Sequence, residues 1–315
     1  MARLRDPEPW VGGDPQISVS ITRKLGLRME KNELDIVRRA YAKHVMAAAG
    51  VADERVETAF ATVPREQFLG PGPWPILRWL GGYMPTPSDD PVYLYADILV
   101  GILPERQLNN GQPSYHALLI ASAAPQPGEH VVHVGAGLGY YSAIFAALVG
   151  PSGSVTAIEF DPGLARRAAS NFGTAPNVNV IPGDGALVAF ATADVIYVNA
   201  GATRPAESWL DRLNDRGRLI LPLTTDGGFC GVDPNFQRRG AVFRIERHDP
   251  DFLARRVSGV AIFPCEGARD AKSERALAAA LSAGGWDKVT RLYRRDDLPE
   301  EQCWLRAPGW CLAYY

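Results

Sequence analysis

Cysteine is scarce in this chain of 315 residues, which has four: Cys230, Cys265, Cys303 and Cys311. They form no C-x-x-C pair and have no companion histidines at metal-ligand spacing. Because such spacing marks zinc sites in a sequence, we predict that the protein holds no metal. Reduced, buried thiols are the expected state, as in most cytosolic proteins.

An excess of positive charge is also lacking. The chain has 33 Lys and Arg against 35 Asp and Glu, which gives a formal net charge of −2 at pH 7. Binding to nucleic acid or to an anionic membrane surface needs a basic surface. We therefore expect neither of them as a partner.

Long apolar runs, repeats and low-complexity tracts are absent as well. No run reaches the roughly 18 apolar residues that span a membrane, and residues 1–7 lack the apolar core of a signal peptide. The expected location is the cytoplasm. With 46% hydrophobic and 22% charged residues, the chain can bury a sizeable core.

The most informative segment runs from Val131 to Tyr140, where a short apolar strand leads into three alternating glycines and then a helix. Such glycines let the backbone approach a ligand, and the helix start offers unpaired N–H groups. A dinucleotide site has the spacing G-x-G-x-x-G, but its last glycine is here Tyr140. Gly135, Gly137 and Gly139 instead favour a ligand without a pyrophosphate, such as the methionine part of S-adenosylmethionine. A plain strand-to-helix turn is the alternative.

Acidic residues follow the next two predicted strands. The strand at 154–159 ends in Glu159, where a doubly wound fold places the carboxylate that accepts hydrogen bonds from ribose hydroxyls. The strand at 178–181 leads into a turn at Asp184, which could face an adenine amino group or could be an ordinary turn residue. Both acids are thus candidates for cofactor binding.

Strands and helices alternate from about residue 117 to 222, with further strands at 193–198 and 218–222. This alternation predicts an α/β fold with a doubly wound, mostly parallel, Rossmann-like sheet and helices on both faces. Such sheets bind ligands at the carboxyl ends of their strands. The glycine loop, the two acids and Asn199 would lie there.

Several further motifs carry a resemblance to a known family. They are residues 63–68 (Val-Pro-Arg-Glu-Gln-Phe), Gln112-Pro113 before a helix, Gly183-Asp184-Gly185, residues 217–222 (Gly-Arg-Leu-Ile-Leu-Pro) and residues 259–264 (Gly-Val-Ala-Ile-Phe-Pro). With the glycine loop, their order resembles protein-L-isoaspartate O-methyltransferase, a class I S-adenosylmethionine-dependent family, over residues 55–265. The resemblance implies an enzyme that uses S-adenosylmethionine, releases S-adenosylhomocysteine and methylates an isoaspartyl-like carboxylate of a peptide or protein.

The residues predicted to bind the cofactor lie in or beside these motifs: His116, His133, Gly135, Ala136, Gly137, Gly139, Tyr140, Tyr141, Glu159, Phe160, Asp184, Gly185 and Asn199. The resemblance implies that His116 lies near the methionine carboxylate of the cofactor. The alternative is a helix residue hydrogen-bonded to a carbonyl. Tyr140 and Tyr141 could lie against the cationic sulfonium or could belong to the core.

Two residues depart from the family's pattern. His133 stands where the family usually has an acid, so it could contact the cofactor or sit neutral in the core. Gly111 stands where the family usually has a serine that touches cofactor and substrate, so a hydroxyl donor is missing. We expect the substitution Gly111→Ser to restore that donor.

Methyl transfer from a sulfonium is an in-line displacement, so the protein must position the acceptor and exclude water. A carboxylate, with a pKa of about 4, is already ionised at neutral pH and needs no base. The loop before the helix shows no obvious base. Amide and hydroxyl groups that could orient a peptide, protein or small-molecule carboxylate are those of Asn109, Asn110, Gln112 and Ser114.

Three regions are predicted: an arm and helix over residues 1–54, a methyltransferase core over 55–265 with a proline- and aromatic-rich insertion at 70–91, and a C-terminal helix and hairpin over 266–315. In the insertion, Trp74, Trp79 and Tyr83 could wall off the substrate or pin the loop to the core. Besides the alternating strands and helices of residues 117–222, we predict an extended arm at 1–32, helices at 33–49, 53–62 and 274–283, antiparallel strands at 241–246 and 257–263, and a final hairpin that turns at Pro308-Gly309.

Three functions stay open at this point. The first is carboxyl O-methylation of a modified aspartyl or other peptide carboxylate. The second is a methyltransferase of the same fold redirected to a small metabolite or a biosynthetic peptide, and the third is a cofactor-binding scaffold without catalysis. A nicotinamide oxidoreductase fits less well because of Tyr140. Neither the acceptor nor the oligomeric state follows from the sequence.

Overall fold

The computed structural model of the chain describes residues 31–78, 81–227 and 239–315. The predicted arm over residues 1–32 lies almost wholly outside the described residues, as do Trp79 and Cys230. Within the described part, no helix combines the length and the apolar character needed to cross a membrane.

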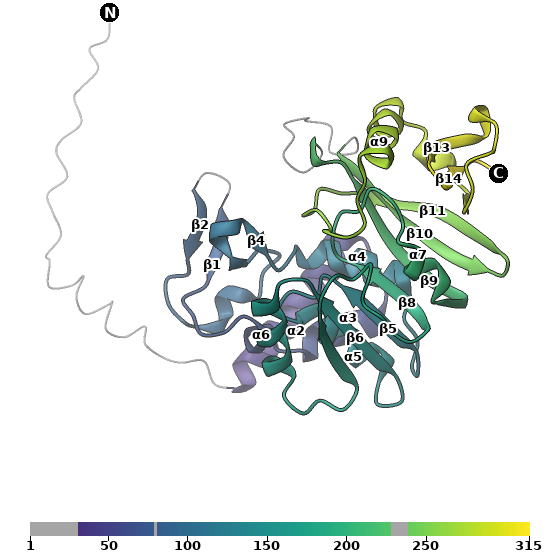
Figure 1. Cartoon of the computed structure of the whole chain (residues 1–315). Coiled ribbons are helices and arrows are strands. Elements are labelled where there is room, and N and C mark those ends of the chain that lie inside the picture. Colours follow the sequence, from purple (N-terminus) through teal and green to yellow (C-terminus); the bar gives the residue numbers. More distant parts are fainter. Residues whose placement is uncertain (1–30, 79–80, 228–238) are drawn as a thin grey trace, which may run out of the picture.

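A ten-stranded mixed sheet runs through the molecule (Figure 1). Its parallel half consists of β5 (His130–Val134), β6 (Ser154–Glu159), β7 (Val178–Pro182), β8 (Ala193–Val198) and β9 (Leu213–Thr224). Its antiparallel half consists of β10 (Gly240–His248), β11 (Asp251–Gly259), β12 (Arg291–Tyr293), β13 (Cys303–Ala307) and β14 (Trp310–Ala313). The order across the sheet is β13-β14-β12-β11-β10-β9-β8-β5-β6-β7. The predicted α/β fold with its parallel Rossmann-like half is confirmed.

Helices cover both faces of this sheet. The α-helices of the described residues are α2 (Lys31–Ala49), α3 (Glu54–Thr62), α4 (Pro113–Ala123), α5 (Tyr140–Val149), α6 (Pro162–Phe172), α7 (Glu207–Asp211) and α9 (Ala271–Ala283). Short 3-10 helices are η1 (Arg65–Phe68), η2 (Pro91–Leu94), η3 (Pro104–Arg106), η5 (Trp286–Lys288) and η6 (Glu300–Gln302). The helices predicted at 33–49, 53–62 and 274–283 correspond to α2, α3 and α9.

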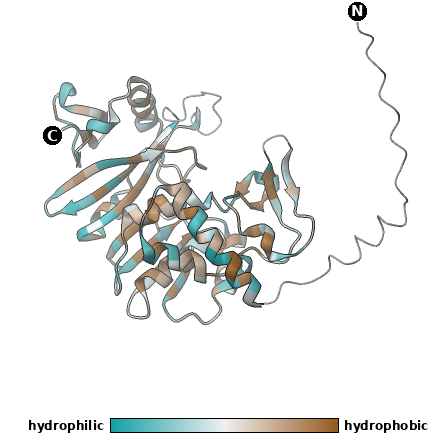
Figure 2. Ribbon diagram, turned by 180° about the vertical axis from the view of Figure 1, so that it is seen from behind, coloured by the Kyte–Doolittle hydropathy of each residue, from teal (hydrophilic) through white to brown (hydrophobic). Residues whose placement is uncertain are grey.

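Side-chain alternation along the strands separates two cores. Val131 and Val195 face the side covered by α2, α3, α4 and α5, whereas Val132 and Ile196 face the side where α7 and α9 pack. All four are fully buried, which explains why these strands are continuous apolar runs in the sequence. Figure 2 shows hydrophobic residues along the central strands and the helices beside them, while the tip of the β10–β11 hairpin is hydrophilic.

Aspartate side chains begin three of the helices. Asp53, Asp161 and Asp270 each accept hydrogen bonds from two N–H groups in the first turn of α3, α6 and α9. A cap of this kind contributes about 1 kcal/mol and defines where the helix starts. Helix α9 therefore begins at Ala271, three residues before its predicted start.

The second strand of the β10–β11 hairpin was predicted at the wrong position. The sequence predicts a strand at 257–263, but β11 spans Asp251–Gly259 and the chain leaves the sheet after Gly259. Along β11 the buried Phe252 and Ala254 alternate with the exposed residues Asp251, Leu253 and Arg255, so the buried apolar pattern is short. The apolar residues 260–263 instead reach the carboxyl ends of the parallel strands, where they line a cavity.

The C-terminal elements complete the sheet beyond β11. Strands β13 and β14 form the predicted hairpin, and Gly309 has φ 79°, as the third residue of a type II turn requires. Trp304 of this hairpin is 6% exposed and packs on Phe243 of β10, with ring centroids 5.2 Å apart. Figure 1 shows these elements, in yellow, at the end of the sheet away from β7.

Two small hairpins precede the parallel half, namely β1 (Pro75–Arg78) with β2 (Gly82–Pro85) and β3 (Gly101–Leu103) with β4 (Leu108–Asn109). Trp74 is buried against Leu94 and Val100, and its Nε1 donates to the Gly70 carbonyl at 2.9 Å. Of the two roles considered for Trp74, the structure shows the one that pins the 70–91 segment to the core.

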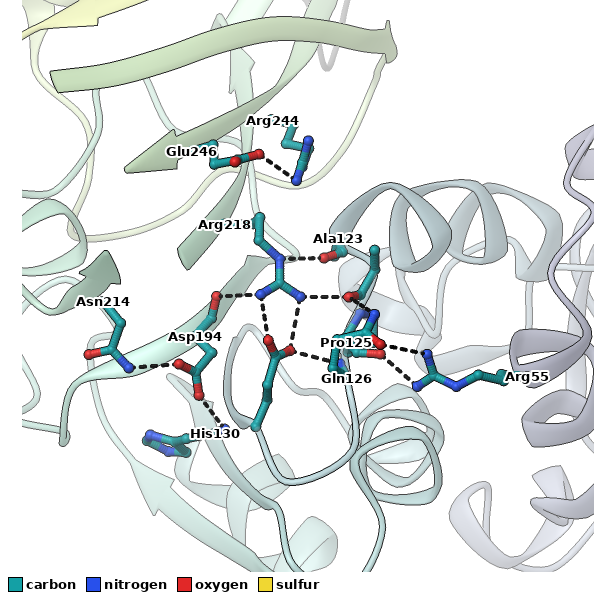
Figure 3. A network of polar contacts seen from close by, with 12 residues as sticks. Arg55, Ala123, Pro125, Gln126, His130, Asp194, Asn214, Arg218, Arg244 and Glu246 are labelled. Atoms are coloured by element: carbon teal, nitrogen blue, oxygen red, sulfur yellow. Dashed lines mark hydrogen bonds and ion pairs between the residues drawn. The ribbon is translucent and has the colours of Figure 1, made fainter. Parts of the chain in front are cut away.

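Arg218 ties β9 to the chain between α4 and β5 (Figure 3). It is 7% exposed, and its guanidinium donates to both carboxylate oxygens of Glu129, at 2.7 and 2.9 Å. The remaining hydrogen bonds go to the carbonyl oxygens of Ala123, Ala124 and Asp194. All five donor positions are used, so this buried charge is fully paired.

Candidate cofactor and acceptor site

A cavity of about 400 Å³ opens at the carboxyl ends of β5, β6 and β8. Its size lies within the range of small-molecule sites. Of the residues predicted to bind the cofactor, the following line it: His116, Gly135, Ala136, Gly137, Tyr140, Tyr141, Glu159, Phe160, Asp184, Gly185 and Asn199. His133 and Gly139 do not. The structure thus brings together residues from five separate sequence segments.

Backbone geometry explains the glycines of the loop after β5. Gly135 has φ 76°, and a Cβ there would lie 3.0 Å from the carbonyl oxygen of Asn199. Gly139 has φ 94°, and a Cβ there would lie 2.6 Å from the ring of Phe172. Gly139 therefore allows α5 to approach α6, and its placement differs from the predicted contact with a ligand. Gly137, by contrast, lines the cavity.

Glu159 ends β6 with its carboxylate in the cavity wall and is 7% exposed. One oxygen accepts from Gly137 N at 2.7 Å and the other from Asp161 N at 2.9 Å. Burial raises the pKa of this carboxyl, although the hydrogen bonds act in the opposite direction. Each oxygen still has a lone pair for a further donor, so two hydroxyls can bind side by side.

The far end of the cavity is formed by the turns after β7 and β8. Asp184 accepts from Ala186 N at 2.9 Å, so its carboxylate also holds the turn. Asn199 donates from Nδ2 to the Gly135 carbonyl at 3.2 Å. Asp184 is therefore both a residue of the cavity wall and a turn residue, so both predicted alternatives apply.

His116 is held rigidly from two sides. Its ring stacks on Tyr141 with centroids 3.5 Å apart, and its Nδ1 lies 2.8 Å from the hydroxyl of Tyr197. Burial lowers the pKa of His116 and raises that of Tyr197, so both are neutral at pH 7. The buried phenol needs an acceptor for its hydrogen, so Tyr197 donates to Nδ1 and the imidazole carries its own hydrogen on Nε2.

Gly111 lies against that Nε2 atom. It has φ 78°, and a Cβ there would lie 2.1 Å from Nε2 of His116. Tyr141 donates from its hydroxyl to the Gly111 carbonyl at 3.2 Å, which fixes the backbone at this point. The expectation that Gly111→Ser simply restores a hydroxyl is therefore wrong, because the new side chain would have to displace His116.

Tyr140 and Tyr141 belong to the core as well as to the cavity wall. Each is 3% exposed, and Tyr140 makes ring contacts with Phe60 and Phe68. Burial keeps the pKa of both phenols well above the usual value. They are neutral aromatic surfaces at the bottom of the site.

His133 lies under α5 and does not line the cavity. It is fully buried, its Nδ1 is 2.8 Å from the hydroxyl of Ser142, and its ring packs on Phe145 and Tyr197. Burial lowers its pKa to about 3, so the ring is neutral. The structure therefore does not support the predicted contact of His133 with the cofactor, because alternation along the strand turns the side chain into the core.

The loop before α4 forms another part of the cavity wall. Asn109, Asn110 and Gln112 line the cavity as predicted, but Ser114 does not. The hydroxyl and N–H of Ser114 both donate to Asp97, at 2.6 and 2.8 Å, so this serine holds the start of α4. Sequence reasoning missed Asp97, which lies seventeen positions earlier and has no motif of its own.

Sequence reasoning also missed two other parts of the wall. Residues 260–266 line the cavity and are held by a bond from Gly201 N to the Phe263 carbonyl at 2.6 Å. Arg106 lines its mouth and forms an ion pair with Asp161 at 2.7 Å. The motif at 259–264 carries a signal for the first, since it belongs to the resemblance, but its alternation favours a strand. Within the described ranges, no group of three or more His, Cys, Asp or Glu side chains is arranged to hold a metal.

Comparisons with known proteins agree with this geometry. The family model of protein-L-isoaspartate(D-aspartate) O-methyltransferase matches residues 82–238. A protein-L-isoaspartate O-methyltransferase of Methanoregula boonei is 30% identical over 234 residues, which cover 73% of this chain and 93% of that protein. One of Thermotoga maritima is 28% identical over 213 residues, which cover 65% of this chain and 59% of that protein.

A solved structure named protein-L-isoaspartate O-methyltransferase superposes with a TM-score of 0.58 at 26% identity, covering 73% of this chain and 66% of that chain. The sheet order and the site at its carboxyl edge are those of a class I methyltransferase fold. The chain belongs to the protein-L-isoaspartate(D-aspartate) O-methyltransferase family. The predicted resemblance is thereby confirmed.

Proposed function

We propose that this protein is an S-adenosylmethionine-dependent carboxyl O-methyltransferase that acts on an isoaspartyl-like carboxylate of a peptide or protein. The observation that carries the proposal is the buried carboxylate of Glu159 in the wall of a cavity of about 400 Å³, beside the loop of Gly135 and Gly137. Membership of the family supports the same activity.

The residues of the cavity fit an adenosyl cofactor. Glu159 offers two carboxylate oxygens to the two ribose hydroxyls, and Asp184 lies where an adenine amino group could donate. Gly137 and Ala136 bring backbone close to the ligand without large side chains. When bound, S-adenosylmethionine supplies a methyl group activated by its sulfonium.

The chain's own residues would then orient the acceptor and exclude water. Asn109, Asn110 and Gln112 line the cavity. The Oδ1 of Asn110 accepts from Val100 N and Gln112 Nε2 donates to Asp97, and Asn109 has an amide N–H left for an acceptor. His116 carries a hydrogen on Nε2 and cannot accept a proton there, so it serves as a donor and not as a base. A carboxylate acceptor needs no base, since it is ionised at neutral pH.

A second candidate is the same reaction type directed to another carboxylate, of a small metabolite or a biosynthetic peptide. The observation that favours it is Gly111, whose missing side chain is replaced in space by the imidazole of His116. A rigid ring presents a donor at a different place from a flexible hydroxyl. The acceptor could therefore differ from that of the relatives.

Methyl-labelled S-adenosylmethionine distinguishes these candidates. Incubation with a peptide that contains isoaspartate should give label that mild base releases as methanol, and the same peptide with ordinary aspartate is the matched control. If neither peptide is labelled and small molecules of an extract gain a base-labile label, the result supports the second candidate. Cofactor binding without transfer to any acceptor supports a scaffold and contradicts the proposal.

We further propose a cytoplasmic location and a peptide or protein carboxylate as the partner, with no nucleic acid. The small number of cysteines supports the location, and the net charge of −2 supports the absence of nucleic acid as a partner. Salt-dependent retention of the purified protein on nucleic acid would contradict the proposal that nucleic acid is not a partner.

A further inference from the structure

The 70–91 segment supports the acceptor wall of the cavity from outside. Leu77 of β1 donates its N–H to the carbonyl of Leu99 at 2.9 Å, and Ile76 bridges to Val100. Leu99 lines the cavity. Backbone hydrogen bonds therefore connect the segment to the cavity wall at Leu99.

Tyr83 of β2 makes the side-chain connection between this segment and the wall. Its hydroxyl accepts from Asn109 Nδ2 at 3.0 Å and donates to the carbonyl of Gln107 at 3.1 Å. Its ring lies against Gly101, where a Cβ would be 3.0 Å from it. Tyr83 itself does not line the cavity.

Asn109 carries the connection into the cavity. Its Oδ1 accepts from Gly111 N at 2.9 Å while its Nδ2 donates to Tyr83, so both ends of the amide are fixed. Gly111 in turn lies against His116. One N–H of the Asn109 amide has no partner among the described residues, and this donor matches an oxygen of a carboxylate or a peptide carbonyl.

We propose that Tyr83 is a positioning residue for acceptor specificity, which acts through Asn109 to fix the 109–112 loop in the geometry that accepts an oxygen-bearing peptide group. The inference rests on the proposed methyl transfer. It makes the 70–91 segment a determinant of the acceptor site, in addition to a covering of the core.

The first test compares Tyr83→Phe with Tyr93→Phe. Both variants lose only a hydroxyl, but Tyr93 is 38% exposed, and its hydroxyl makes no hydrogen bond with the other described residues, whereas its backbone N–H donates to Asp90. Tyr83→Phe should raise the KM for the isoaspartyl peptide about tenfold, because the peptide loses the equivalent of one oriented hydrogen bond. The kcat and the affinity for S-adenosylhomocysteine should change less than about twofold, and Tyr93→Phe should change none of them.

A double-mutant cycle with Asn109→Ala tests whether Tyr83 acts through Asn109. In that background Tyr83→Phe should have less than about a twofold further effect on KM, since the shared step is already lost. Full multiplication of the two single effects would overturn the proposal. So would a Tyr83→Phe variant that is indistinguishable from Tyr93→Phe.

Hydrogen exchange of the loop gives a readout that does not depend on activity. The amide of Gly111, which donates to Asn109, should exchange faster in Tyr83→Phe than in Tyr93→Phe. If exchange responds but the wild-type protein methylates no carboxylate, the function proposed above fails and the assignment of Tyr83 to the loop stands. If methylation occurs and exchange is unchanged, the assignment of Tyr83 fails alone.

Discussion

His116 and Gly111 are fixed as a pair by the space that they share. The imidazole occupies the volume that a side chain at position 111 would need, with Nε2 only 2.1 Å from the place of its Cβ. Tyr197 and Tyr141 hold the ring on its other sides. A glycine that looks like the loss of a functional side chain in the sequence is thus required by the packing of a nearby histidine.

The buried His133 makes a testable contribution to acid sensitivity. Its pKa of about 3 in the folded protein lies below the roughly 6.5 of an unfolded chain, so unfolding takes up a proton. The stability from this residue is present above pH 6.5 and is lost as the pH falls toward 3. Between pH 6.5 and 3, replacement by glutamine should flatten the pH dependence of the free energy of unfolding by about 1.4 kcal/mol per pH unit.

Urea unfolding at pH 7 and at pH 5 measures this slope. His44→Gln, on the exposed face of α2, is the matched control and should leave the slope as in the wild-type protein. Parallel slopes for all three proteins would mean that His133 is not kept neutral by the fold.

Single residues show where sequence reasoning succeeds and where it stops. Glu159 could be predicted, because the end of an apolar strand beside a glycine loop has a defined place in a doubly wound sheet. The orientation of His133 could not be predicted, because the side that a strand residue faces depends on a register that only the assembled sheet defines. The role of Asp97 could not be predicted, because only the folded structure brings it to Ser114.

At the scale of elements, the side chain of Arg218 connects β9 to the chain before β5 through an ion pair and three hydrogen bonds to carbonyl oxygens. Arg218 and Glu129 are joined by two hydrogen bonds in a largely buried setting. Removing one partner leaves a buried charge without compensation. We expect Arg218→Ala to lower the free energy of unfolding by about 3–5 kcal/mol.

The same measurement on an exposed ion pair provides the control. Arg295 and Asp297 are 3.5 Å apart and largely exposed, so Arg295→Ala should cost less than about 1 kcal/mol. Denaturant unfolding of both variants gives the comparison. Equal costs would show that the Arg218 network in Figure 3 is not a stabilising connection.

Elements with strong apolar patterns were predictable, and those defined by long-range pairing were not. The parallel strands β5, β6 and β8 contain short apolar runs that are almost wholly buried, and the aspartates that cap α3 and α6 can be identified in the sequence. Strand β11 buries only Phe252 and Ala254 in its first half, so the apolar run at 260–263 placed the predicted strand too far along the chain. The hairpin β1–β2 depends on pairing with the 99–100 segment, which no local signal specifies.

At the scale of the whole molecule, we propose that residues 266–315 form one folding unit with the methyltransferase core. Trp304 and Leu277 belong to the same buried cluster as Val132 and Ile196 of the parallel half. Strand β12 pairs with β11 and so continues the sheet. An extension in the sequence thus becomes part of the central structure.

The substitution Trp304→Ala tests this unity. Loss of a buried tryptophan should lower the free energy of unfolding by about 3–5 kcal/mol, and the whole protein should still unfold in one transition. Tyr315→Ala, at a position 64% exposed, should have little effect. If far-ultraviolet circular dichroism and tryptophan fluorescence then give separate transitions, the C-terminal region is an independent unit.

The central claim is that the cavity at the carboxyl ends of β5 and β6 binds an adenosyl cofactor through Glu159. Calorimetric titration with S-adenosylhomocysteine tests it most directly, on the wild-type protein and on Glu159→Ala. We expect one site per chain, an affinity that falls as the pH drops through the raised pKa of Glu159, and a loss of about 1–3 kcal/mol in the variant. Binding of nicotinamide dinucleotide instead, or an unchanged affinity in a folded Glu159→Ala protein, would contradict the account.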